Sequence, residues 1–170
     1  MKSFRTNTFR VLIGTCLIFG ATLSAQAAEY SGSFTAKITK QEALSIMDSG
    51  QHVLVLQTST GPHKSTGKNG YFDGGTVIVN DTVDLVNGSG THHGYWTVTK
   101  DGETVTNSLT GKVKTVMAAD GKTPITTIDG TFDGLYGTNL YGTLHPVGTY
   151  TVKFTSPTEY MSTWEVTGFK

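Results

Sequence analysis

The sequence has almost no cysteine and, after its first residues, no arginine. Its only cysteine is Cys16 and its only arginines are Arg5 and Arg10. A chain without residues 1–27 can therefore form no disulfide and no thiolate site. It also lacks the planar guanidinium groups that bind phosphates and carboxylates through paired hydrogen bonds. Disulfide-stapled folds and cysteine-based metal or catalytic centres are excluded for such a chain.

Positive charge is also scarce. The whole chain carries 13 basic and 13 acidic residues. Without Lys2, Arg5 and Arg10, 10 lysines remain against 13 acidic residues, which is a formal charge of −3. Binding to nucleic acid or to an anionic membrane surface needs clustered positive charge. We therefore expect no nucleic acid partner.

Long apolar runs are missing, apart from one near the start of the chain. A positively charged beginning precedes an apolar run from Val11 to Leu23, and Ala25-Gln26-Ala27 is a small-residue cleavage pattern. This order is typical of a bacterial secretory signal peptide. The run is too short and interrupted for a membrane span, and no second candidate follows. We predict removal of residues 1–27, export to the periplasm or medium, and one domain over residues 28–170.

A strong hairpin signal lies at Asp101-Gly102. These residues join two alternating runs between Asp84 and Met117, and Asp-Gly is typical of a two-residue turn. Counting outward from the turn pairs Lys100 with Glu103 and Trp96 with Asn107. Because side chains alternate across a strand, one face is apolar and the other, from Tyr95 to Lys114, carries hydroxyls and lysines. We expect the apolar set to face the core: His92, Trp96, Val98, Val105, Leu109, Val113 and Met117.

Further strands are predicted by alternating or apolar runs elsewhere. They cover residues 30–37, 52–58, 76–86, 125–132, 148–155 and 160–169. The run 76–86 is either one long strand, which turns Asp81 inward, or a hairpin with its turn at Asn80-Asp81. The single long strand is the favoured interpretation.

Two segments are predicted not to be strands. The capping pattern Thr39-Lys40-Gln41-Glu42 and the spacing of the apolar residues after it favour a short helix that ends near Gly50. The polar, glycine-rich segment from Ser59 to Gly70 is typical of a solvated loop, which would place His63 in water. A doubling of Leu-Tyr-Gly-Thr at 135–138 and 140–143 is interpreted as bent or bulged strand positions.

About eight strands with short connections predict an all-β fold: a single eight-stranded antiparallel barrel, with one short N-terminal helix. No helical segment is long enough for the crossovers of a parallel sheet. A domain of this length can bury roughly two-thirds of its surface and needs no disulfides or metal ions to be stable.

Turn and glycine motifs between residues 52 and 169 resemble those of small exported bacterial proteins with the allene oxide cyclase-like barrel, a calycin fold related in shape to lipocalins. The residues that carry the resemblance are Asp84–Gly90, Gly94-Tyr95, Asp101-Gly102, Gly111-Lys112, Gly130–Phe132, Gly137-Thr138, Gly148–Tyr150, Phe154–Tyr160 and Trp164-Glu165. The resemblance implies an eight-stranded antiparallel barrel with an apolar lumen. In the plant enzymes of this fold, the lumen folds and cyclises an unsaturated fatty-acid epoxide without a cofactor.

The histidines do not form a metal-binding pattern. Residues 28–170 contain His52, His63, His92, His93 and His145. Neighbours on a strand point to opposite faces, so His92 and His93 cannot bind one ion together. We expect no metal site and no cofactor.

Asp81 is the carboxylate that the long-strand interpretation places among valines. If it were buried without a partner, its pKa would rise, which would make it a possible general acid or base. Asp84 and Glu165 are predicted to lie on faces opposite the apolar side chains.

The inward aromatic side chains point to a ligand site or to a filled interior. An eight-stranded barrel has an interior that is either packed or holds one small ligand. The predicted ligand-binding residues are Asp81, His92, Trp96, Phe132, Tyr150 and Trp164.

The leading hypothesis is a barrel that binds a small apolar molecule in its lumen or at its mouth. One alternative is a cofactor-free isomerase or cyclase in which Asp81 or His92 assists. Another is a structural or interaction protein of the envelope, with the threonine-rich face as its contact surface. A filled lumen favours this last alternative, whereas an open apolar cavity disfavours it.

Overall fold

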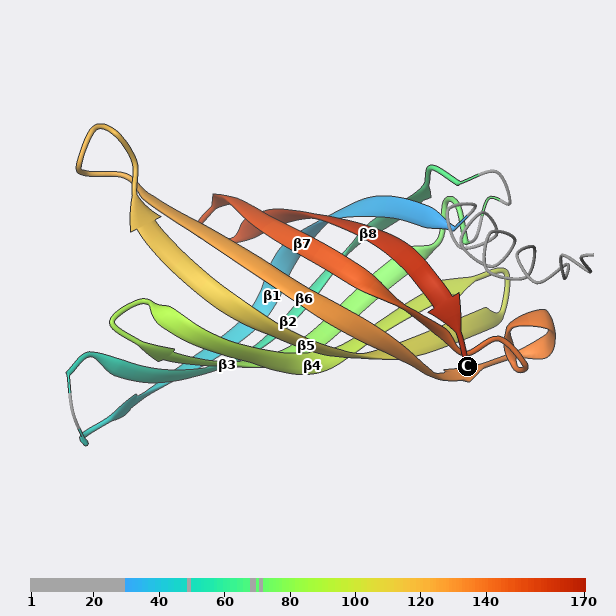
Figure 1. Cartoon of the computed structure of the whole chain (residues 1–170), viewed down its shortest axis with the longest axis horizontal. Helices are drawn as coiled ribbons and strands as arrows, with labels where there is room; N and C mark the ends of the chain where they lie inside the picture. The colour runs from blue at the N-terminus through green and yellow to red at the C-terminus, as the bar shows by residue number, and fades with distance from the viewer. Residues whose placement is uncertain (1–29, 49, 68–69, 71) are drawn as a thin grey trace, which may run out of the picture.

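The computed structural model describes residues 30–170, except residues 49, 68–69 and 71. Eight antiparallel strands pair in sequence order and close into one barrel (Figure 1). The strands are β1 (Ser31–Ile46), β2 (His52–Ser65), β3 (Thr76–Val86), β4 (Ser89–Lys100), β5 (Glu103–Met117), β6 (Pro124–Gly137), β7 (Pro146–Ser156) and β8 (Glu159–Phe169). One 3-10 turn, η1 (Asn139–Tyr141), lies between β6 and β7. The expected signal peptide, residues 1–27, lies outside the described residues.

The described residues form the predicted all-β antiparallel barrel of eight strands. No helix among them is both long and apolar enough to cross a bilayer.

The β4–β5 hairpin has the predicted register. Lys100 pairs with Glu103 and Trp96 with Asn107. Asp101 (φ 50°) and Gly102 (φ 81°) both adopt the left-handed conformation that a tight hairpin turn requires. The apolar face is buried as expected except for Met117, which is 55% exposed because β5 extends past the closed part of the barrel.

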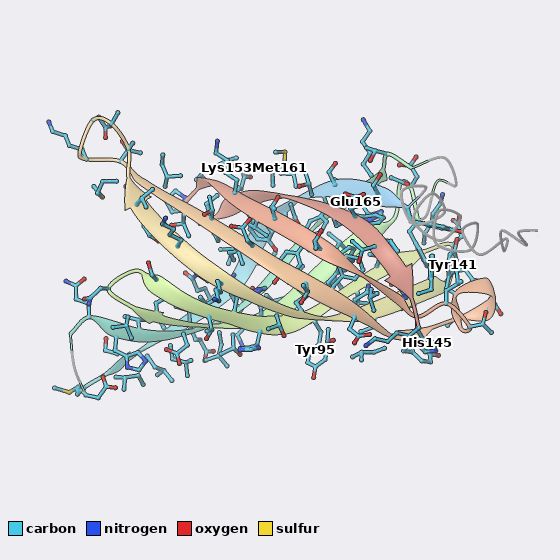
Figure 2. All side chains as sticks on the ribbon, viewed as in Figure 1. Tyr95, Tyr141, His145, Lys153, Met161 and Glu165 are labelled. Atoms are coloured by element: carbon cyan, nitrogen blue, oxygen red, sulfur yellow. The ribbon has the colours of Figure 1, made fainter. Side chains whose placement is uncertain are left out.

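Strand β3 is a single strand, as favoured from the sequence. Asp81 lies within it, pairs with Gln57 of β2 and Gly94 of β4, and is buried in the interior. Side chains predicted to face outward do so, and Figure 2 shows Lys153, Met161 and Glu165 pointing away from the barrel axis.

The predicted helix after Thr39 is wrong. Strand β1 continues to Ile46, and its residues Ala43 and Ser45 pair with Val55 and Val53 of β2. The Thr39 hydroxyl, expected to cap a helix, donates to the Thr58 carbonyl. One or two isolated helical turns are marginal in water, whereas the strand satisfies the backbone groups of this segment through β2.

The predicted loop from Ser59 to Gly70 is also wrong over its first half, because β2 continues to Ser65. His63 is 2% exposed instead of solvated. Its backbone is held by Gly74 and Gly75 of the β2–β3 connection: the His63 N–H donates to the Gly75 carbonyl, and the His63 carbonyl accepts from the Gly74 N–H. The polar side chains of this stretch alternate between the two faces of the strand, so its polarity does not indicate a loop.

The repeated Leu-Tyr-Gly-Thr has two different structures. In the first copy, Tyr136 pairs with Thr106 and Gly134 with Asn107, which leaves Leu135 as the extra residue of a β-bulge. The second copy runs through η1 instead of a strand. The bulge interpretation therefore holds for the first copy only.

The two ends of the barrel differ. At the closed end, Phe72 of the β2–β3 connection packs on Tyr141 of η1, with ring centroids 4.4 Å apart. At the other end, β8 pairs with β1 only as far as Lys37, and β7 pairs with β6 only as far as Thr127. Strands β1–β6 continue beyond these points as long hairpins (Figure 1), and we call this the open end.

Large aromatic rings lie over glycines of neighbouring strands. A Cβ atom at Gly148 would lie 2.4 Å from the Phe132 ring, and one at Gly32 would lie 2.6 Å from Trp164. Glycine therefore provides the space for these rings inside a barrel that has little room.

We expect Gly148→Ala to destabilise the protein by about 1–3 kcal/mol, the usual effect of overpacking a filled core. The added methyl group would contact both the Phe132 ring and the Glu165 carbonyl. Urea denaturation measures the effect. Gly168→Ala is the control, because its Cβ would make only an ordinary 3.5 Å contact with Val147. Equal stability of the two variants would contradict the packing argument.

Candidate functional site

Three buried side chains form a hydrogen-bonded chain across the barrel interior. Asp81 Oδ2 lies 2.7 Å from His92 Nε2, and His92 Nδ1 lies 2.8 Å from Tyr150 Oη. The side chains of Asp81 and His92 are each 3% exposed. We call this set the Asp–His–Tyr chain, and its members come from β3, β4 and β7.

Two glycines allow Tyr150 to reach His92. His92 pairs with Gly111 of β5, Gly111 pairs with Gly130 of β6, and Gly130 pairs with Tyr150 of β7. The tyrosine ring therefore crosses two strands in one row. A Cβ atom at Gly111 would lie 2.7 Å from Tyr150 Oη, and one at Gly130 would lie 2.6 Å from the same atom. Any larger residue in this row would displace the ring from His92.

The direction of the hydrogen bonds follows from the protonation of the groups. Burial, followed by the nearby charge of Asp81, raises the pKa of Tyr150, so its hydroxyl keeps its proton. The protonated hydroxyl can donate to His92 Nδ1 or accept from it, according to the protonation of the imidazole. His92 Nε2 donates to the Asp81 carboxylate, which can only accept when it is ionised.

Among the described residues, only one of the two carboxylate oxygens of Asp81 accepts hydrogen bonds. Gln57 Nε2 also donates to Oδ2, at 3.2 Å, and Gln57 Oε1 accepts from Gln41 Nε2 at 3.1 Å. Asp81 Oδ1 is buried and has no hydrogen-bond partner among the residues that the structure describes. Leaving such an acceptor unpaired typically costs about 1–3 kcal/mol.

A second buried polar pair lies beside the chain. The hydroxyls of Ser59 and Tyr160 are 2.5 Å apart. Burial raises the pKa of Tyr160, while its hydrogen bond with Ser59 acts in the opposite direction. Tyr160 therefore stays protonated.

A small cavity of about 20 Å³ adjoins the Asp–His–Tyr chain. This space suffices for about one water molecule and is far smaller than a typical ligand pocket of roughly 300–1,000 Å³. Besides the polar groups, seven apolar or aromatic side chains line this cavity: Phe34, Val79, Trp96, Leu109, Ile128, Val152 and Phe154. The lumen is therefore largely filled by side chains.

All six residues predicted for the site are buried in the interior. Asp81, His92 and Tyr150 form the chain, and Trp96 lines the cavity beside them. Phe132 and Trp164 pack against Trp96 farther from the cavity, with ring centroids 5.4 and 5.6 Å from its ring. The structure thus divides the predicted set into four residues at the cavity and two in the packed core.

Four further residues belong to the site but were not predicted from the sequence: Gln57, Ser59, Tyr160 and Ser162. Gln57 and Ser59 follow Val53 and Val55 at alternate positions of β2, so the period of the strand was the available signal. Ser162 lies between Tyr160 and Trp164 on the inner face of β8 and gives the same signal. Asp81 is buried, as the long-strand interpretation predicted, but it has partners, because His92 and Gln57 donate to it.

His63 lies in the packed part of the barrel. Its ring stacks on Trp164 with centroids 5.4 Å apart and planes 19° apart. His63 Nδ1 lies 3.0 Å from the Phe72 carbonyl and donates to it, while Nε2 is buried and makes no hydrogen bond to the described residues. Burial lowers the pKa of His63.

His52 contrasts with His63 because it lies near the outer surface. Its Nδ1 lies 2.9 Å from both oxygens of Asp48, and its Nε2 lies 2.7 Å from Asp84 Oδ1. These contacts, the one with Asp48 first, raise the pKa of His52. Over the described part of the chain, no three metal-ligating side chains gather into a site.

Comparisons with protein-family models, with curated proteins and with solved structures find no significant match. The function of this site is therefore inferred from its geometry and chemistry.

We expect His63 to make the fold sensitive to acid. Its folded-state pKa lies below the ordinary value of 6.5, so the unfolded chain binds this proton more readily. Its contribution to stability is therefore fully present above pH 6.5 and is lost as the pH falls below that value. His63→Leu should lose less stability than the wild type between pH 7 and about pH 5. Urea denaturation at each pH measures the difference.

The control for this prediction is His93→Leu, which removes an exposed histidine from the outer face of β4. Its stability should follow the wild-type dependence on pH. Parallel curves for His63→Leu and the wild type would contradict the assignment of acid sensitivity to His63.

Proposed function

We propose that this barrel binds a small, mostly apolar molecule that carries one hydrogen-bond donor. The observation that supports this proposal is Asp81 Oδ1, a buried carboxylate oxygen with no donor among the described residues, at the edge of a cavity. Binding would supply the missing donor and remove the cost of the unpaired acceptor. The cavity is large enough for a hydroxyl or amine group but too small for the rest of a ligand.

The body of the ligand would lie along the inner face of the open end. Val53 and Val55 of β2 pair with Leu85 and Val83 of β3, and these four side chains share the face that carries Gln57 and Asp81. Val113 of β5 is buried in the same core. Contact with this surface removes apolar area from water at about 25 cal/mol per Å². The donor group and the apolar body thus have separate places.

We also propose that the protein is exported and that its barrel is of the allene oxide cyclase-like type. We propose that residues 1–27 direct export and are then removed, so that the mature chain begins at Ala28; the intact mass of the exported protein checks this boundary. The resemblance to small exported proteins with the allene oxide cyclase-like barrel supports a lipid-like ligand for the open end. Fold resemblance alone does not establish an activity.

A second candidate function is a cofactor-free isomerase or cyclase. The Asp–His–Tyr chain favours it, because a carboxylate, an imidazole and a phenol in series can take up and return a proton at the cavity. In this case Asp81 acts as the base at Oδ1, while His92 and Tyr150 stabilise its charge. A ligand recovered in rearranged form from the wild type, and unchanged from Asp81→Asn, would identify an enzyme.

The binding proposal is tested by displacement of a fluorescent fatty-alcohol analogue from the mature chain. The competitors are dodecanol, which carries a donor, and dodecyl methyl ether, which does not. We expect dodecanol to bind more tightly by about ten-fold or more, because a hydrogen bond to a charged group contributes about 1.5–3 kcal/mol. Asp81→Asn should largely remove this preference.

Asp84→Asn is the matched control, because Asp84 lies on the same strand but on the outer face. It should keep the preference for dodecanol. Failure of the wild type to bind either competitor, or equal affinities for the two, would overturn the proposal. The first of these results, together with the filled lumen, would favour a structural or interaction role in the envelope.

A further inference from the structure

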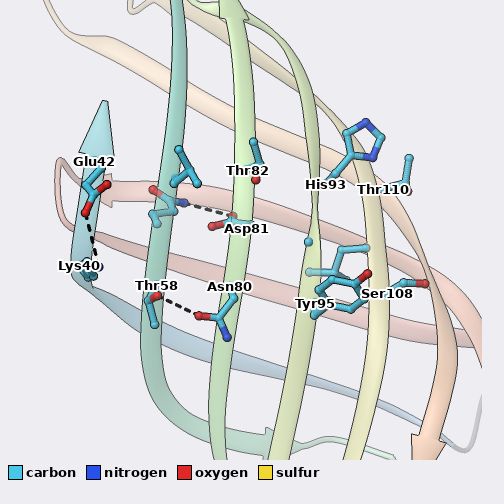
Figure 3. A pocket seen from close by; sticks show the side chains of 14 residues that line it. Lys40, Glu42, Thr58, Asn80, Asp81, Thr82, His93, Tyr95, Ser108 and Thr110 are labelled. Atoms are coloured by element: carbon cyan, nitrogen blue, oxygen red, sulfur yellow. Dashed lines mark hydrogen bonds and ion pairs between the residues drawn. The ribbon is translucent and has the colours of Figure 1, made fainter. Parts of the chain in front are cut away.

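The outer wall of the barrel carries a second and larger hollow. It has a volume of about 600 Å³ and extends over strands β1–β5 (Figure 3). This volume lies within the usual range for small-molecule sites, roughly 300–1,000 Å³. We call it the outer groove. Neither the Asp–His–Tyr chain nor the ligand proposed for the open end occupies it.

Within the groove, β4 lies very close to β3. Gly94 pairs with Asp81, and a Cβ atom at Gly94 would lie 2.6 Å from Asp81 Cβ and 2.5 Å from the Asn80 carbonyl. Because Gly94 has no side chain, β4 can lie this close to Asp81. Both residues line the groove.

One aromatic ring stands in this groove. Tyr95 follows Gly94 and is 55% exposed, and Figure 2 shows it projecting outward from the barrel wall. Figure 3 places it beside Ser108. An exposed tyrosine offers an apolar ring face together with a polar hydroxyl. It is therefore suited to a ligand that has both apolar and polar surfaces.

Polar, uncharged side chains make up much of the rest of the lining, beside two leucines and three charged residues. Thr58 Oγ1 donates to Asn80 Oδ1 at 2.8 Å, which leaves the Asn80 NH₂ group as a donor at the groove surface. Thr82, His93 and Thr110 add two hydroxyls and an imidazole (Figure 3).

The charged side chains at the groove edge cancel each other. Lys40 Nζ lies 3.4 Å from Glu42 Oε1, and the Asp81 carboxylate points to the opposite side of the sheet, toward His92. An anionic ligand would meet no unpaired cation in this lining, and a cationic ligand would meet no unpaired carboxylate. Neutral ligands fit best.

We infer that the outer groove binds a neutral carbohydrate of one or two sugar rings. The C–H face of a pyranose would lie against the Tyr95 ring, and its hydroxyls would exchange hydrogen bonds with Asn80, Thr82 and His93. Apolar contacts for the sugar ring come from Leu56, Leu109 and Tyr95, which lie beside the polar groups of the lining. An extended peptide has no free edge to join, because β2–β5 are each paired on both sides.

Saturation-transfer NMR with maltose, cellobiose and N,N′-diacetylchitobiose tests this inference on the mature chain. We expect at least one of the three disaccharides to bind, with saturation transferred most strongly to its C–H protons. Titration calorimetry then measures the affinity for that sugar. Tyr95→Ala should weaken binding by about ten-fold, whereas Tyr95→Phe, which keeps the ring, should retain most of the affinity.

Tyr136→Ala is the matched control. Tyr136 is a tyrosine of similar exposure, 60%, on β6, outside the groove, and its loss should leave sugar affinity unchanged. Absence of saturation transfer to all three sugars would overturn the inference, and so would equal losses in Tyr95→Ala and Tyr136→Ala. Dodecanol binding at the open end is a separate readout, so the failure of one site does not imply failure of the other.

Discussion

The packing of aromatic rings over glycines determines much of this structure. A closed barrel of eight strands has an interior that side chains can just fill, and here several rings exceed the space that ordinary neighbours would leave. Gly32 and Gly148 provide that space for Trp164 and Phe132. The same device at Gly130 places Tyr150 against His92, so one constraint fixes both the core and the Asp–His–Tyr chain. The same packing of rings over glycines that fills the core therefore also forms the Asp–His–Tyr chain.

The candidate binding site lies between the packed aromatic core of the barrel and its open end. On one side Trp96, Phe132 and Trp164 pack together with centroid distances between 5.4 and 6.5 Å. On the other side the hairpins of β1–β6 extend past β7 and β8. A polar chain buried wholly in the packed core would be inaccessible, and one at the tips of the hairpins would be solvated. Between them it is dry and still close to an opening.

Much of the fold could be predicted from the sequence because strands alternate and turns have their own chemistry. Asp101-Gly102 determined the β4–β5 register, and the alternation of residues 76–86 placed Asp81 inside. The contact of His92 with Tyr150 could not be predicted, because it depends on how β5 and β6 align between them. The helix expected after Thr39 and the loop expected around His63 were wrong for the same reason. Both predictions rested on local polarity and capping patterns. The pairing of β1 with β2, which makes both segments strands, depends on the closed sheet.

Alternation along β3 and β4 gives the two candidate sites a common wall. Asn80 and His93 face the outer groove, while their neighbours Asp81 and His92 face the interior. A ligand on one side can influence the other only by moving this shared backbone. Asp81 is held from inside by both His92 and Gln57, and the close approach of Gly94 leaves β4 little freedom to move toward it. Because the two sites lie on opposite faces of this wall, we expect them to bind their ligands independently.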